Sequence, residues 1–310
     1  MSDYPKITEF GATNYLVRKT ITKEQKAWSA FNPSIMLSNE GEYWMAVRSS
    51  NYVLMTNGHA SLTTEQKIRN KVYLVRLDPE TWQFDESTLK EIDVKKLRPD
   101  IIRNIEDPRL FWDGESYCIT ATFLEKTVPI ARLCKIRLES LESANPLDIE
   151  IYPSPTGKVE KNWMPIVGTK NFIYKSDSVI EDGVLKEVKA PEVSKLFRGG
   201  SQIIRLDNKS SLGIIHQLHY KIYGAMSPST FGALQSIRQY THRFVKYNND
   251  YEITHVSEKF LFLEDGIEFA AGLTEYKDQY VISLGRSDRY SFITTIDKQK
   301  VLDMLESVND

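Results

Sequence analysis

Five stretches of this chain repeat one pattern, and this repetition limits the fold more than any other feature. Each stretch has a short strand-like run, a polar or glycine-containing turn, and a second strand rich in aromatic and β-branched residues. They cover residues 32–48, 107–120, 162–175, 200–216 and 268–285. Hairpins repeated along an all-β chain are typical of a β-propeller, in which each blade is a small antiparallel sheet around a central axis. The sequence therefore predicts a five-bladed β-propeller.

The spacing between the repeats is uneven. Residues 51–70 and 180–195 are longer than a regular array needs, so we expect insertions on one face of the propeller. Residues 63–69 could form a helix, loop or lid within the first insertion, and residues 301–308 have the apolar spacing of a short C-terminal helix. The sequence has no low-complexity tract and no Gly/Ser linker, which favours a single propeller domain over residues 1–310.

The composition is that of an ordinary globular protein. The chain has 310 residues, of which 41% are hydrophobic, and a net charge of -2, which argues against binding to nucleic acid through bulk charge. No basic N-terminal stretch precedes an apolar run and no segment is apolar for about eighteen residues, so we expect a cytoplasmic protein without a membrane partner. Cys118 and Cys134 lie in apolar, strand-like contexts and are predicted to be reduced core thiols rather than a disulfide or a metal site.

Polar side chains recur at the same points of the repeats. The innermost strands of a propeller begin around its central channel, so residues at these points are expected to converge there. Those at or just before a first strand are Asn32, Asp107, Lys161, Arg198, Gln202 and Glu268, and those at the end of a second strand are Arg48 and His216.

The run Glu106-Asp107-Pro108-Arg109 is the most highly charged of these stations. It can be structural, since Asp-Pro is a common turn dipeptide and Arg109 could neutralise Asp107. It can also be catalytic, because it places a carboxylate beside a fixed cation at the start of an apolar strand.

The charge balance at the converging ends is cationic. The strong carboxylate candidate is Asp107, followed by Glu268 and Asp288, whereas the candidate cations and their polar neighbours are Arg48, Arg109, Lys161, Arg198, Arg243, His216, Tyr240 and His242. Hydrolytic glycosidases usually need two carboxylates. An enzyme whose nucleophile or leaving group is a phosphate needs one carboxylate and several cations, which this sequence fits better.

Several of these residues also have a structural interpretation. Trp163 could stack on the face of a sugar ring or serve as core packing. Glu268 could bind substrate or pair with Arg286 as a tie within a blade, and His242 with Arg243 could form a pair on a strand surface. The Arg198-Gly199-Gly200 run could present backbone N–H groups to a phosphate.

In order along the chain, these stations resemble a known family of enzymes. Phe31-Asn32-Pro33, Val47-Arg48, the run 106–117, Lys161-Asn162 and Ile215-His216 look like the landmarks of the five-bladed propeller enzymes typified by glycoside hydrolase family 130. That family contains mannoside phosphorylases, and related mannosyltransferases share the propeller. The resemblance implies that Asp107 is the catalytic acid, exchanging a proton with the glycosidic oxygen directly or through a sugar hydroxyl, and that Arg48, Lys161 and His216 line the sugar or phosphate site.

The chain departs from the phosphorylase pattern at several stations. It has Lys161-Asn162-Trp163 where the phosphorylases commonly have Lys-Asp. The segments 198–202, 240–245 and 267–273 look more like the branch associated with glycosyltransferases.

The leading hypothesis is therefore inverting glycosyl transfer from a nucleotide sugar or sugar phosphate to a hydroxyl acceptor. Asp107 would be the base and Arg48, Lys161, Arg198 and His216 the clamp on the leaving group, with Tyr240 and Arg243 as further candidates. Substrate contacts are also expected from Asn32, Arg109, Trp163, Gln202, His242 and Glu268.

This chemistry calls for no metal or cofactor. The alternatives are a glycoside phosphorylase or hydrolase, and a carbohydrate-binding propeller without catalysis. The acceptor could also be a modified base in DNA, in which case a basic rim of Lys67, Arg69 and Lys71 would be needed.

Overall fold

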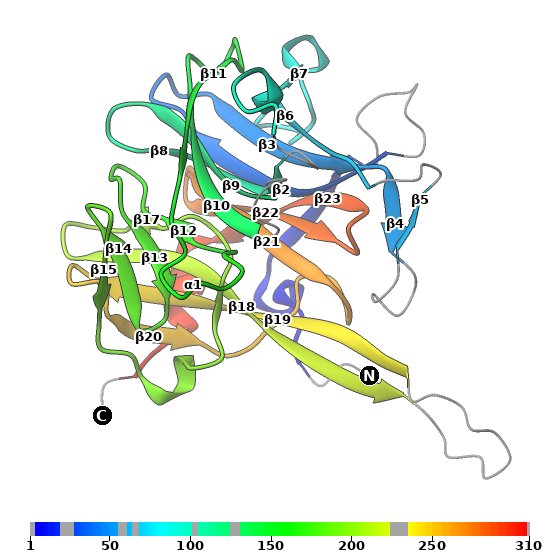
Figure 1. The fold of residues 1–310 in the computed structure, drawn as a ribbon. Helices are drawn as coiled ribbons and strands as arrows, with labels where there is room; N and C mark the ends of the chain where they lie inside the picture. Colours follow the sequence, from blue (N-terminus) through cyan, green and yellow to red (C-terminus); the bar gives the residue numbers. More distant parts are fainter. Residues whose placement is uncertain are drawn as a thin grey trace, which may run out of the picture.

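The computed structural model describes residues 4–18, 28–54, 61–63, 68–100, 105–124, 131–223 and 235–308, and it is a five-bladed β-propeller (Figure 1). The predicted fold is confirmed. Each of the five sequence repeats supplies the first two main strands of one blade, so the repeat unit is the inner half of a blade.

The first three blades are four-stranded antiparallel sheets, whose strands follow one another from the channel outward. Blade 1 consists of β2 (Ser29–Leu37), β3 (Tyr43–Ser50), β6 (Asn70–Leu77) and β7 (Lys90–Glu91). Blade 2 consists of β8 (Glu106–Trp112), β9 (Tyr117–Leu124), β10 (Ala131–Leu138) and β11 (Pro146–Ile151). Blade 3 consists of β12 (Met164–Pro165), β13 (Phe172–Lys175), β14 (Ser178–Glu181) and β15 (Val184–Glu187).

The last two blades are less regular. Blade 4 consists of β16 (Arg198–Gly199), β17 (Ile204–Arg205), β18 (Ser210–Tyr223), β19 (Gln235–Asn248), β20 (Ile253–Ser257) and β24 (Leu305–Ser307). Blade 5 consists of β21 (Glu268–Tyr276), β22 (Gln279–Arg286), β23 (Tyr290–Asp297) and β1 (Thr13–Arg18). The outermost strand of the last blade thus comes from the start of the chain, and Thr13 of β1 lies opposite Thr295 of β23.

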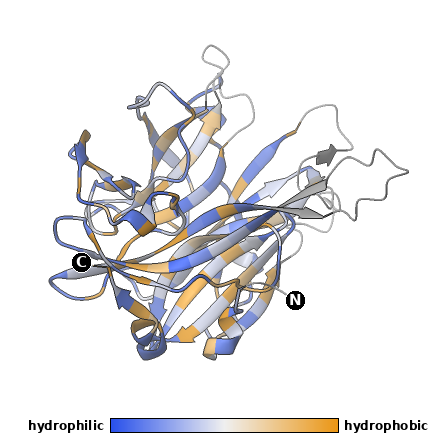
Figure 2. Ribbon diagram, turned by 90° about the horizontal axis from the view of Figure 1, so that it is seen from below, coloured by the Kyte–Doolittle hydropathy of each residue, from blue (hydrophilic) through white to orange (hydrophobic). Residues whose placement is uncertain are grey.

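Two features depart from a regular propeller. The short hairpin of β4 (Tyr52–Leu54) and β5 (Ser61–Thr63) is inserted in blade 1. Strands β18 and β19 are each 14 residues long and run out of the body together as a hairpin (Figures 1 and 2). The sequence repeats predicted neither the length nor the projection of this pair.

Three sequence expectations need correction. Residues 180–195 are not an insertion, because they form most of the two outer strands of blade 3 and the 3-10 turn η4 (Glu192–Ser194). Thr63 ends β5, while residues 64–67 of the expected helix or lid lie outside the described residues. The C-terminal helix α1 spans Lys298–Asp303 rather than 301–308, since Asp297 caps its start and β24 follows it.

The hydrophobic core lies between neighbouring blades, and apolar and polar residues alternate along many of the strands (Figure 2). Trp44 and Leu74 of blade 1 pack with Ile119 of blade 2 in one cluster, and Phe244 of blade 4 packs with Ile282 of blade 5 in another. Cys118 and Cys134 are both free and buried, as the sequence predicts. Within the part of the chain that the structure describes, no helix is long and apolar enough to span a membrane.

The remaining 3-10 turns are η1 (Ile7–Phe10), η2 (Glu86–Thr88) and η3 (Val94–Lys96). η2 and η3 lie between strands β6, β7 and β8, whereas η1 precedes β1, and its Ile7 is part of the core between blades 4 and 5.

Candidate active site

A cavity of about 390 Å³ gathers polar residues from all five blades. Its walls include seven residues predicted from the sequence, which are Asn32, Arg48, Asp107, Lys161, Arg198, His216 and Tyr240. These seven residues therefore converge on one cavity, as the sequence predicted.

The backbone at the entrances of the first three blades takes an unusual conformation. Asn32, Asp107 and Asn162 have φ values of 48°, 52° and 64°, in the left-handed region. Among residues with a Cβ, Asn and Asp tolerate this region best. The pairing of β2 with β3 and of β8 with β9 is also bulged at these points, between Phe31 and Ser34 and between Glu106 and Arg109. A bulge re-aims a side chain, and here Asn32 and Asp107 both face the cavity.

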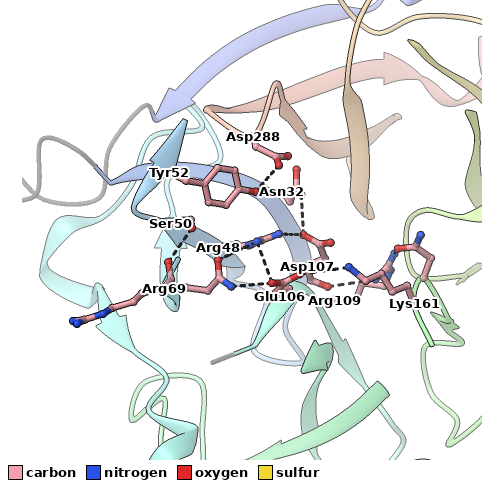
Figure 3. Close-up of polar contacts among 12 residues, drawn as sticks. Asn32, Arg48, Ser50, Tyr52, Arg69, Glu106, Asp107, Arg109, Lys161 and Asp288 are labelled. Carbon is pink, nitrogen blue, oxygen red and sulfur yellow. Dashed lines mark hydrogen bonds and ion pairs between the residues drawn. The ribbon is translucent and has the colours of Figure 1, made fainter. Parts of the chain in front are cut away.

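Two donors hold the Asp107 carboxylate (Figure 3). The amide Nδ2 of Asn32 donates to Oδ1 at 2.8 Å, and Nη1 of Arg48 donates to the same oxygen at 2.9 Å. Both bonds fall on Oδ1, and among the described residues none falls on Oδ2. One carboxylate oxygen is thus fixed and the other is left for a ligand.

Arg48 is itself held on several sides. Its Nε and Nη2 donate to Oδ1 of Asn70 at 3.1 and 3.0 Å, and its Nη2 lies 3.5 Å from Oε1 of Glu106. The guanidinium also lies over the rings of Phe31 and Tyr52. Because Arg48 is buried and its geometry is fixed, it is a preorganised positive charge beside Asp107.

These contacts set the ionisation of Asp107. Burial raises the pKa of this carboxyl, but Arg48, Lys161 and the Asn32 amide outweigh burial and lower it to about 2. Asp107 is therefore ionised at neutral pH, which is the form that accepts a proton or a hydroxyl hydrogen bond.

Arg109 does not neutralise the Asp107 carboxylate. Its guanidinium is buried, and it donates to the backbone oxygen of Gly200 at 2.6 Å, the backbone oxygen of Asp107 at 3.3 Å and Oδ1 of Asn162 at 3.3 Å. The structure thus places Arg109 behind the site, where it braces the entrances of blades 2, 3 and 4. Burial lowers its pKa to about 10.

Lys161 and Arg198 line the cavity from blades 3 and 4. Nζ of Lys161 lies 3.5 Å from Oε2 of Glu106. The Arg198 guanidinium has no hydrogen bond or ion pair to any described residue, although it lines the cavity. It is therefore a charge available to an anionic ligand.

His216 and Tyr240 form a stacked pair on the cavity wall, with ring centroids 5.1 Å apart. Burial and the nearby His242, Arg109 and Arg198 hold the pKa of His216 well below its usual range, so the ring is neutral at pH 7. A neutral imidazole can donate one hydrogen bond to a ligand but adds no charge to the clamp.

Five other predicted site residues do not line the cavity. Trp163 is buried in the core of blades 2 and 3, and its Nε1 donates to Oε2 of Glu160 at 3.0 Å, so it is packing rather than a platform for a sugar. Gln202 is buried as a tie between blades, donating to the backbone oxygens of Ile35 and Leu273 at 2.7 and 2.8 Å.

Glu268, His242 and Arg243 are the other three. Glu268 accepts backbone N–H groups of residues 262–264 at 2.8 to 3.0 Å, while burial raises its pKa to about 8. It lies opposite Arg286 in the pairing of β21 with β22, but the Arg286 guanidinium pairs with Glu264 instead. His242 is enclosed by Phe260 and Phe262. Arg243 donates to the backbone oxygen of Ser257 and lies over the ring of Phe197.

The cavity also contains two residues to which the sequence assigned no role in the site, Tyr52 and Asp288. Asp288 is held by Tyr52, whose hydroxyl donates to its Oδ2 at 2.6 Å (Figure 3). Burial raises the pKa of Asp288, and Asp107 and Glu106 add to this rise, although Arg48 and Tyr52 oppose it. Tyr52 lies in the inserted hairpin and Asp288 in the turn after β22, so neither stands at a repeat start. The sequence placed Asp288 among the carboxylates at the converging ends, but no motif gave it a role beside Asp107.

The basic rim considered for a DNA acceptor is only partly described. Lys67 lies outside the described residues, and Lys71 pairs with Glu91 at 2.8 Å. The exposed Arg69 side chain points away from Asp107 in Figure 3. In the described ranges, no group of three or more His, Cys, Asp or Glu residues could hold a metal ion.

No family model and no curated protein matches this chain. Solved structures do share its fold. A mannose phosphorylase from Leishmania mexicana, in complex with phosphate ion, is 13% identical over 98% of this chain and 94% of its own, with a TM-score of 0.59. The beta-1,2-mannobiose phosphorylase from Listeria innocua is 12% identical over 94% and 99%, with a TM-score of 0.57. A GDP-Man-dependent mannosyltransferase from Leishmania mexicana is 12% identical over 96% and 94%, with a TM-score of 0.56.

Proposed function

We propose that this protein is a glycosyltransferase that moves a sugar, with inversion, from a phosphate-bearing donor to a hydroxyl acceptor. The observation that carries the proposal is the Asp107 carboxylate, which is fixed through Oδ1 by Asn32 and Arg48 and has an open Oδ2 in a cavity that also holds Lys161 and Arg198. The shared fold with mannoside phosphorylases and a mannosyltransferase supports a carbohydrate substrate.

In the proposed reaction, Oδ2 of Asp107 accepts the proton of the acceptor hydroxyl as its oxygen bonds to the anomeric carbon. The bond from that carbon to the donor phosphate breaks in the same displacement, and its electron pair leaves with the phosphate oxygen. Arg198 and Lys161 would stabilise the departing charge, with a hydrogen bond from neutral His216. In this proposal Arg48 positions the Asp107 carboxylate and does not bind the leaving phosphate, because its N–H groups already donate to Asp107 and Asn70.

Asp107→Asn tests the base directly. We expect turnover to fall by about 10²–10⁴-fold, the usual contribution of a positioned proton carrier. The matched control is Asp148→Asn, which removes an exposed carboxylate that pairs with Arg137 on the outer strand of blade 2. Turnover on the identified donor that matches the wild type, in a folded Asp107→Asn protein, would overturn the assignment.

A donor screen separates a transferase from a phosphorylase. Thermal stability and turnover would be measured with inorganic phosphate, mannose 1-phosphate, and UDP- and GDP-sugars. Stabilisation by a nucleotide sugar or its diphosphate without a response to phosphate supports the transferase, because a ligand stabilises the state that binds it. The opposite response supports the phosphorylase.

Asp288 favours a second candidate function, which is glycoside hydrolysis. The cavity holds two carboxyl groups whose pKa values are moved in opposite directions, with that of Asp107 lowered and that of Asp288 raised. Such a pair can serve as base and acid. If hydrolysis is the reaction, Asp288→Asn should abolish release of sugar from a mannobiose, whereas a transferase should lose much less activity on its donor.

A carbohydrate-binding propeller without catalysis would be favoured if Arg109 tied up Asp107 and closed it off from the channel. Arg109 instead bonds to the backbone of Asp107, and its guanidinium does not meet the carboxylate. This arrangement supports catalysis over simple carbohydrate binding.

A further inference from the structure

A second hollow of about 720 Å³ opens beside the cavity, between blades 3 and 4. We call it the groove. It shares Lys161, Asn162 and Arg198 with the cavity that holds Asp107. A molecule whose sugar lies at Asp107 can therefore extend past Lys161 and Arg198 into the groove.

The groove wall is positively charged. Its cations are Lys158, Lys161, Lys175, Lys195 and Arg198. Among the described residues that line it, the one carboxylate is Glu160, which is buried and turned inward to accept hydrogen bonds from Trp163, Ser154 and Tyr174. Lys195 pairs with Glu192 at 2.5 Å and Lys175 lies over the ring of Tyr174, but Arg198 has no described partner. In a chain with a net charge of -2, this concentration of positive charge is local.

The groove also exposes large apolar side chains. Leu196 is 68% exposed, Val159 58% and Tyr220 57%, and all three line the groove but not the cavity. The apolar surface is therefore found beyond the junction at Lys161 and Arg198. Three such side chains around one hollow form a surface that a flat, partly apolar ligand can cover.

We propose that the groove binds the nucleoside diphosphate part of a sugar donor. This inference rests on the proposed function, since it places the donor sugar at Asp107. The diphosphate would then meet Lys161 and Arg198 at the junction, and the nucleoside would lie against Leu196, Val159 and Tyr220.

A sugar 1-phosphate would use less of this surface. Its single phosphate would be satisfied at the junction, and it has no group to cover the apolar residues or to approach Lys158 and Lys195. A nucleoside diphosphate fits within the groove and matches it in charge and in its apolar portion.

Calorimetric titration of the full chain with UDP, GDP and inorganic pyrophosphate tests the groove without requiring turnover. We expect one of the two nucleotides to bind at least about tenfold more tightly than pyrophosphate, which corresponds to about 1.4 kcal/mol. Nucleotide binding no tighter than pyrophosphate binding would overturn the inference.

Two variants locate the site. The double variant Leu196→Ser with Tyr220→Ala should remove most of the nucleotide's advantage and leave pyrophosphate binding unchanged. Lys158→Glu should weaken nucleotide binding, whereas Lys209→Glu, with the same change of charge in an exposed turn of blade 4, should not. Equal effects of the two charge reversals, or no effect of the double variant, would overturn the inference. Circular dichroism checks that each variant is folded.

Two further results separate this inference from its premise. Asp107→Asn should retain nucleotide binding, because Asp107 does not line the groove. If the wild type binds a nucleotide but transfers no sugar from any donor, the groove is upheld and the proposed function is overturned. If the wild type binds neither nucleotide but transfers sugar from mannose 1-phosphate, the proposed function is upheld and the groove inference is overturned. A ten-residue single-stranded oligonucleotide that binds more tightly than UDP and GDP would assign the groove to a polymer and overturn the inference.

Discussion

At the residue scale, the site depends on Asn and Asp side chains at strained backbone positions. Asn32, Asp107 and Asn162 occupy the same point of successive blades with positive φ. Such a conformation costs on the order of 1 kcal/mol per residue outside glycine. At these positions the left-handed conformation directs Asn32 and Asp107 into the cavity and lets Asn162 accept a hydrogen bond from Arg109.

The hydrogen bond from Asn32 should tune Asp107. Asn32→Gly removes the amide without adding backbone strain, so the pKa of Asp107 should rise. We expect the acid limb of the pH–rate profile to move upward, by up to about one pH unit. Asn39→Gly, in the exposed turn between β2 and β3, is the control and should keep the wild-type profile. An unmoved acid limb in Asn32→Gly would show that this bond does not set the ionisation of the base.

Asp107 should also make stability depend on acid pH. Its pKa is about 2 in the folded protein and near 3.8 in the unfolded chain. The stabilisation is therefore fully present above about pH 4 and is lost as the pH falls through 2, and it amounts to about 2 kcal/mol. Urea titrations at pH 5 and pH 2 should show a larger loss for the wild type than for Asp107→Asn. The same loss in both proteins would contradict the assigned shift.

The sequence predicted that Asn32, Arg48, Asp107 and Lys161 face the central channel, because they lie at the starts or ends of the repeated strands. It could not separate these from Trp163, Gln202 and Glu268. A polar or aromatic residue at a strand entrance can point to the channel or between blades, and for Asn32 and Asp107 a one-residue bulge turns the side chain to the channel. Asp288 and Tyr52 reach the cavity from a turn and an inserted hairpin, where no repeat marks them.

At the element scale, close contact between blade 5 and blade 1 positions the site. A Cβ on Gly285 of β22 would lie 2.1 Å from Oδ1 and 2.4 Å from the backbone N of Asn32. Glycine at this position therefore lets β22 approach β2 closely enough to fix the residue that holds Asp107.

Gly285→Ala should push the two strands apart. We expect a loss of about 1–3 kcal/mol in the free energy of unfolding and a fall in activity, since Asn32 must move. Gly41→Ala is the comparison, because a Cβ there meets nothing within 4 Å and the only cost is that of its positive φ, about 1 kcal/mol. Activity retained in Gly285→Ala and equal to that of Gly41→Ala would mean that the contact does not position the site.

Element lengths explain why the expected insertions differed from the observed ones. Residues 51–70 contain a true inserted hairpin, whereas residues 180–195 complete an ordinary blade whose outer strands are short. Length alone does not distinguish these cases. Blade 3 has strands of only two to four residues, so its outer half gave little strand signal.

At the scale of the whole molecule, the propeller is closed by its first strand. Val17 of β1 is buried and packs in the cluster shared by blades 5 and 1, while the neighbouring Leu16 is 53% exposed. The five phased repeats predicted the number of blades, but they did not indicate that β1 would complete the last one.

Two substitutions on β1 test the closure. Val17→Ala should lower the free energy of unfolding by about 1–3 kcal/mol, since it removes buried apolar surface and leaves a cavity. Leu16→Ala, on the opposite face of the same strand, should change it by less than about 0.5 kcal/mol. Chemical denaturation of both variants gives the comparison, and similar losses would show that β1 does not seal the core.

The closure by β1 has a consequence for how the protein is made. During synthesis β1 emerges before its partner β23, and the strands of blades 1 to 3 and most of those of blade 4 lie between the two, so β1 waits unpaired while they emerge. Contacts between such distant segments make folding slow. Because the walls around Asp107 come from every blade, the nascent chain has no assembled site until the strands of blade 5 have emerged.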